Sequence, residues 1–122
     1  MDTKVAPPLA SAWAIFCVFA LAVLAWTPGQ YMVRTGVLSG HEEHFLAYLL
    51  SALTISATQR RTAKSTWIGL ALVLYASMLE LGQIYVPGRH PAVGDFYASA
   101  LGALTGAAIA LPLSRVLSRV LP

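Results

Sequence analysis

Residues 9–26 read LASAWAIFCVFALAVLAW, an apolar run of 18 residues without a charged side chain. A helix rises about 1.5 Å per residue, so this run comes close to the ~30 Å thickness of a bilayer's hydrocarbon core. Pro7 and Pro8 suit a helix start, and Pro28-Gly29 end the run. We expect a membrane-spanning helix here, retained in the protein rather than cleaved as a signal peptide.

The composition of the whole chain supports a membrane protein. Of its 122 residues, 57% are hydrophobic and only 11% are charged, and the mean hydropathy is +0.68. A soluble domain of this size buries only about 60–70% of the surface that its unfolded chain exposes, so it cannot hide so much apolar surface from water. The net charge of +3 fits loops that face anionic lipid, and we expect no nucleic-acid partner.

Three further apolar runs follow the first. With it they predict spans at about 9–26, 43–59, 66–86 and 95–113, within a single domain of residues 1–122. The second run, Phe45 to Thr58, is only about 21 Å long as a helix. To cross, it must include Glu43, His44 and the residues back to His41, so we expect residues 41–44 to be helical and close to the membrane.

The distribution of cations predicts the orientation of the bundle. With four spans, one side carries six cations and the other carries only Arg34 and Arg89. Cytoplasmic loops are rich in Lys and Arg, so both termini are expected in the cytoplasm and residues 27–43 and 87–95 outside. The six cytoplasmic cations would be Lys4, Arg60, Arg61, Lys64, Arg115 and Arg119.

Polar residues converge on the outer side of this predicted bundle. His44 and Tyr48 share a face of the second span, as do Glu80 and Gln83 in the third. The next loop supplies Arg89, and Asp95 opens the fourth span. These residues, the candidate ligand-binding set, are His44, Tyr48, Glu80, Gln83, Arg89 and Asp95.

A carboxylate inside a membrane is costly, so we expect Glu80 to have a partner or to be protonated. Arg89 is the expected partner because a guanidinium binds a carboxylate with two bonds, and His44 is the second candidate. Asp95 competes for Arg89 or caps the fourth span. Such pairs serve equally as structural clamps between helices or as parts of a ligand site.

A stripe of small residues runs down the fourth span, from Ser99 to Gly102 and Gly106. Small residues four apart allow two membrane helices to approach closely. We interpret Ser99, Gly102 and Gly106 as helix-packing positions.

Taken together, these motifs resemble the VanZ-like family of small bacterial membrane proteins. His44-Phe45-x-x-Tyr48 matches the family's HF-x-x-Y motif, and E-x-x-Q, P-G-R and the Asp with two spaced Gly follow in order over residues 40–106. The chain departs from the family pattern at Gly40-His41, where the family has Asp-Lys, and at Ser99, where it has Asn. The resemblance implies four helices, a multi-pass location in the bacterial cytoplasmic membrane and a link to resistance against the glycopeptide teicoplanin.

The fold class predicted is therefore all-α, a polytopic bundle of four transmembrane helices. The leading functional hypothesis is binding of a lipid headgroup, a lipid-linked envelope intermediate or an amphiphilic antibiotic. One alternative is an accessory subunit that packs on other membrane subunits, and another is an enzyme that acts on a lipid-linked substrate with Glu80 as base and His44 as acid. The sequence favours a non-catalytic protein without metal or cofactor, because it holds no metal-ligand spacing, activated nucleophile or phosphate-binding glycine loop.

Overall fold

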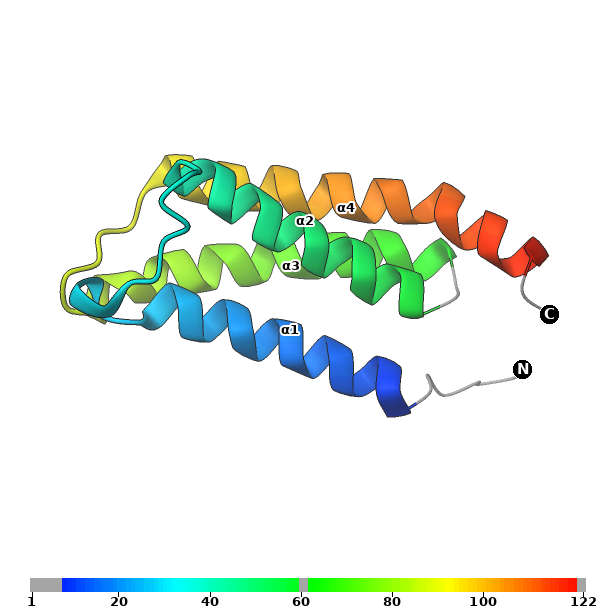
Figure 1. The fold of residues 1–122 in the computed structure, drawn as a ribbon, viewed down its shortest axis with the longest axis horizontal. Coiled ribbons are helices and arrows are strands. Elements are labelled where there is room, and N and C mark those ends of the chain that lie inside the picture. The colour runs from blue at the N-terminus through cyan, green and yellow to red at the C-terminus, as the bar shows by residue number, and fades with distance from the viewer. Residues whose placement is uncertain (1–7, 60–61, 121–122) are drawn as a thin grey trace.

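The structure, a computed structural model, describes residues 8–59 and 62–120. These residues form four helices and no strand (Figure 1), so the predicted all-α fold is confirmed. Short 3-10 turns, η1 (Gly29–Tyr31) and η2 (Gln83–Tyr85), follow the first and third helices. The helices are α1 (Pro8–Trp26), α2 (Gly40–Thr58), α3 (Thr62–Gly82) and α4 (Val93–Val120).

The helices lie roughly along one axis and alternate in direction (Figure 1). The α1–α2 and α3–α4 connections meet at one end of the bundle, at the left of the figure. The described ends of α1 and α4 that lead to the chain termini are at the other end. Lys4, Arg60 and Arg61, which contribute to the predicted orientation, lie outside the described residues.

Three helical segments are long and apolar enough to cross a membrane: Pro8–Trp26, Lys64–Tyr85 and Val93–Leu113. The α2 helix is not among them, because its first turn carries several polar residues. Residues 41–44 are helical, as predicted, and α2 begins at Gly40. Its 19 residues give a length of about 28 Å. Helix α4 continues to Val120, one to two turns beyond the predicted end.

A capping box fixes the start of α2. The Ser39 hydroxyl accepts a hydrogen bond from the Glu42 backbone N–H at 3.3 Å, and Glu42 Oε2 accepts one from the Ser39 N–H at 2.7 Å. These bonds satisfy two backbone donors that would otherwise lack partners at the helix end. The box therefore extends α2 by one polar turn at the end of the bundle where the connections meet.

The most extensive helix contact joins α2 and α4. Gly102 packs against the backbone of α2, where a Cβ atom would lie 3.1 Å from Leu49 N and overlap the Phe45 carbonyl oxygen. Gly106 lies one turn further on, and a Cβ there would overlap the Leu49 carbonyl oxygen. The small residues of α4 thus allow the backbones of the two helices to approach closely.

By contrast, α1 packs loosely on α2 and α3, and its buried residues are Ala10, Cys17 and Leu21. Side-chain hydrogen bonds attach it along its length. Near its start, Trp13 donates to the Thr54 hydroxyl at 2.9 Å. In the middle, the Tyr75 hydroxyl donates to the Val18 carbonyl at 2.6 Å, and Trp26 at the end donates to the Leu79 carbonyl at 3.1 Å.

We predict that Tyr75→Phe lowers the stability by only about 0.6 kcal/mol, the average measured for hydrogen bonds between membrane helices. Cys17 is buried and is the chain's one cysteine, so a fluorogenic maleimide reports unfolding on heating. Tyr97→Phe is the matched control, because Tyr97 lies exposed on α4. A loss of several kcal/mol from Tyr75→Phe would show that this one bond holds α1 in place.

Candidate functional site

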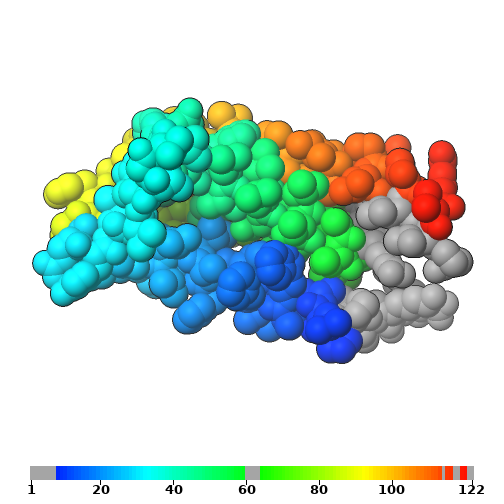
Figure 2. All heavy atoms as spheres, in the orientation of Figure 1, coloured from blue at the N-terminus to red at the C-terminus, as the bar shows by residue number. Residues whose placement is uncertain are grey.

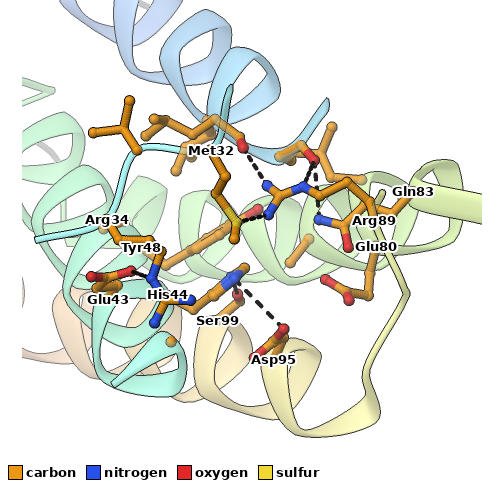
Figure 3. Close-up of a pocket in the computed structure, with 18 of the residues that line it drawn as sticks. Met32, Arg34, Glu43, His44, Tyr48, Glu80, Gln83, Arg89, Asp95 and Ser99 are labelled. Carbon is orange, nitrogen blue, oxygen red and sulfur yellow. Dashed lines mark hydrogen bonds and ion pairs between the residues drawn. The ribbon is translucent and has the colours of Figure 1, made fainter. Parts of the chain in front are cut away.

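A cavity of about 600 Å³ lies at the end of the bundle where the α1–α2 and α3–α4 connections meet. All four helices contribute to its walls, and residues 32–35 and 38 of the α1–α2 connection also line it. All six residues of the candidate ligand-binding set line this cavity, and Ser99 does too (Figure 3). Gly102 and Gly106 do not line it and lie in the α2–α4 contact instead.

The predicted pair of Glu80 with Arg89 is wrong. Arg89 Nε donates to the Ala25 carbonyl at 3.1 Å, and its terminal nitrogens bond the Leu24 carbonyl and Met32 Sδ (Figure 3). The last carbonyls of a helix lack backbone partners and carry a partial negative charge, which a guanidinium satisfies well. Arg89 therefore caps the end of α1, and it attaches that helix to the loop before α4.

Gln83 reinforces the same helix end. Its side-chain nitrogen donates to the Ala25 carbonyl at 3.1 Å, and the residue is only 3% exposed. This bond fixes which end of the amide is the nitrogen, so the Gln83 side-chain oxygen is left as an acceptor. Figure 3 shows that oxygen on the Glu80 side of the cavity.

Glu80 is buried, with 8% of its surface exposed. One carboxylate oxygen accepts a hydrogen bond from the Ala92 backbone N–H at 2.7 Å, just before α4 begins. A carboxylate is favourable at the start of a helix because the helix dipole is positive there. No described residue donates a hydrogen bond to the second carboxylate oxygen of Glu80. That oxygen remains partly accessible.

Asp95 binds two histidines of α2. Its carboxylate lies 2.7 Å from His41 Nδ1 and 3.8 Å from His44 Nε2. His44 Nδ1 in turn lies 3.3 Å from the Ser99 hydroxyl. His41 lies in the first turn of α2. Its partner is Asp95. Asp95 links the starts of α2 and α4 and does not compete for Arg89.

One side of this site is formed by residues outside the candidate ligand-binding set. Arg34 Nε lies 2.7 Å from Glu43 Oε2, and Thr35 donates to Glu43 Oε1 through its N–H at 2.9 Å and its hydroxyl at 2.8 Å. These contacts hold the segment before α2 across the cavity (Figure 3). The segment has no periodic pattern, and the sequence alone does not show that it folds back so that Arg34 and Thr35 meet the Glu43 carboxylate.

Comparisons of the chain with protein-family models, with curated protein sequences and with solved structures each give no match. The function must therefore be argued from the geometry of the cavity.

Proposed function

We propose that the chain is a multi-pass membrane protein whose cavity binds the polar head of an amphiphile. The amphiphile would be a lipid headgroup, a lipid-linked envelope intermediate or an amphiphilic antibiotic. The observation that supports this proposal is a hollow in the surface on the side of the bundle, between α1, α2 and the segment that connects them (Figure 2).

The walls of the cavity suit a molecule with one polar and one apolar end. The lining combines polar side chains, such as His44, Glu80 and Asp95, with apolar ones, such as Leu21, Leu24 and Leu46. Leu24 of α1 and Leu46 of α2 are both partly exposed and border the cavity. A polar head would bind inside, while an attached hydrocarbon chain stays among lipid at this apolar rim.

The proposal includes α2 as the fourth span. Helix α2 packs along α4, which is long and apolar enough to cross, and its length of about 28 Å approaches the bilayer core. Its polar first turn lies beside the cavity, where water and a polar ligand head offset the cost of burying such groups.

The orientation and the family follow as parts of the same proposal. Lys64, Arg115 and Arg119 belong to the end of the bundle opposite the cavity, so the positive-inside rule favours a cavity that faces outward and cytoplasmic termini. An outward cavity in a bacterial cytoplasmic membrane agrees with the VanZ-like resemblance, whose founding members are linked to resistance against a lipid-tailed antibiotic that acts outside the membrane.

Leu46→Trp tests the side entrance. We expect the bulky indole at the rim to weaken amphiphile binding about tenfold or more, which is a loss of about 1.4 kcal/mol. Binding is measured by titrating single-chain phospholipids into the purified chain and recording native mass spectra. Leu50→Trp is the matched control, because Leu50 lies one turn away on α2, is exposed and does not line the cavity. Equal binding by both variants would contradict entry from the side.

An accessory subunit is the second candidate, and the loose packing of α1 favours it. Large side chains on the outer face of α1, such as Ile15, Phe16 and Phe19, contact no other helix closely enough to be buried. Such a surface suits a neighbouring membrane helix as well as lipid. A purified chain that runs alone in mild detergent, without a stoichiometric protein partner, would count against this candidate.

A further inference from the structure

The charges around the cavity indicate the chemistry of the head that it binds. Its lining holds two guanidinium groups and three carboxylates: Arg34, Arg89, Glu43, Glu80 and Asp95. Arg34 and Glu43 neutralise each other at 2.7 Å. Arg89 is directed to the last carbonyls of α1. Glu80 and Asp95 are therefore left without a Lys or Arg partner among the described residues.

Of these two carboxylates, Glu80 has the greater need of a positive charge. Asp95 has His41 and His44 beside it, whereas the hydrogen-bond donor to the Glu80 carboxylate among the described residues is a neutral backbone N–H. A carboxylate that is more than nine-tenths buried is costly unless it is paired or protonated. Among the described residues, no group of His, Cys, Asp and Glu side chains is arranged to hold a metal ion.

We propose that the bound head carries a primary ammonium group, which binds between Glu80, Asp95 and the side-chain oxygen of Gln83. This inference rests on the proposed function and names its ligand class. An ammonium group has three N–H donors and no acceptor, and these side chains offer acceptors from the α3–α4 side of the cavity (Figure 3). The ammonium group would be the cationic partner that Glu80 does not have among the described residues.

The lining also distinguishes a primary from a quaternary ammonium group. Quaternary groups have no N–H and are held by cages of aromatic rings. Tyr48 is the one Phe, Tyr or Trp residue that lines the described cavity. Carboxylates and an amide oxygen outnumber it, so a primary ammonium group fits better.

The test uses the purified full chain in mild detergent and four lysophospholipids with the same acyl chain, measured by native mass spectrometry. Their heads are phosphoethanolamine, N-acetylphosphoethanolamine, phosphocholine and phosphoglycerol. We expect lysophosphatidylethanolamine to bind about tenfold more tightly than each of the others, because only its head offers a charged N–H donor. Dodecylammonium shows which class of molecule provides the ammonium group. If it binds as tightly as lysophosphatidylethanolamine, any amine amphiphile fits the site. If it binds more weakly, the site prefers an aminophospholipid.

Glu80→Gln is the decisive variant, because its side-chain oxygen still accepts the Ala92 N–H while the charge is lost. We expect it to lose most of the preference for lysophosphatidylethanolamine over the N-acetylated lipid, although Asp95 and the Gln83 oxygen remain in place. Glu42→Gln is the matched control, since Glu42 is exposed at the same end of the bundle. A Gln side chain at this position still accepts the capping hydrogen bond from the Ser39 N–H. That control must keep the preference for the ammonium head.

Two results would overturn the inference, and they are distinguishable. Equal binding of all four heads by the unmodified chain would exclude ammonium recognition but leave amphiphile binding in place. Absence of binding for every lipid and for dodecylammonium would contradict the proposed function as well. Preservation of the preference in Glu80→Gln would show that another group recognises the head.

Discussion

Gly102→Val is expected to abolish most of the folded protein. A side chain at this position meets backbone rather than a flexible neighbour: its Cβ would lie 3.0 Å from Phe45 C and overlap the attached oxygen. To relieve the overlap, α2 and α4 must move apart along the most extensive contact of the bundle. We expect a loss of about 3 kcal/mol, at the upper end of the usual range for overpacked cores.

The measurement is the yield of monodisperse protein in mild detergent, together with the temperature at which Cys17 reacts with a fluorogenic maleimide. Ala108→Val is the matched control, because Ala108 is exposed on the same helix, and it should behave like the unmodified chain. If Gly102→Val folded with an unchanged midpoint, the two backbones would not be in contact as described.

Arg89→Met is expected to release α1 from the rest of the bundle. The substitution keeps the length of the side chain but removes the charge that bonds the Leu24 and Ala25 carbonyls. Hydrogen bonds to charged groups contribute about 1.5–3 kcal/mol each, and those made by one side chain are not additive, so we expect a loss of about 2–4 kcal/mol. This loss should far exceed that of Tyr75→Phe, which removes a single neutral bond.

Cys17 reports this release directly, because it is buried where α1 meets the bundle. In detergent, it should react with maleimide faster in Arg89→Met than in the unmodified chain, at temperatures where the other helices remain folded. Arg34→Met is the matched control: its ion pair with Glu43 is partly exposed and should contribute less than about 1 kcal/mol. An unchanged rate in Arg89→Met would mean that α1 is held by its other contacts.

Much of the fold follows from the pattern of apolar runs. Each run became a helix, and the shortness of the second correctly indicated that residues 41–44 are helical. Ser39 and Glu42 form a capping box that sequence inspection can find, because the two residues have the spacing of that motif. The extension of α4 to Val120 lies past the apolar run, where hydropathy alone does not separate a continued helix from a segment that lies at the membrane interface.

The candidate site could be predicted only in part, and Arg89 shows why. Helical spacing placed His44, Tyr48, Glu80 and Gln83 on faces that do line one cavity. Charge complementarity favours Glu80 as the partner of Arg89 when side chains alone are compared. The actual acceptors of Arg89 are backbone carbonyls at the end of α1, and the sequence does not show where a helix end lies in space.

The most direct test of amphiphile binding is native mass spectrometry of the full chain purified in mild detergent from the membranes that produce it. We predict one amphiphile retained per chain, reduced by Leu46→Trp and not by Leu50→Trp. A chain that carries no amphiphile in these spectra, or that appears only together with a stoichiometric protein partner, would contradict the proposal that the cavity binds an amphiphile.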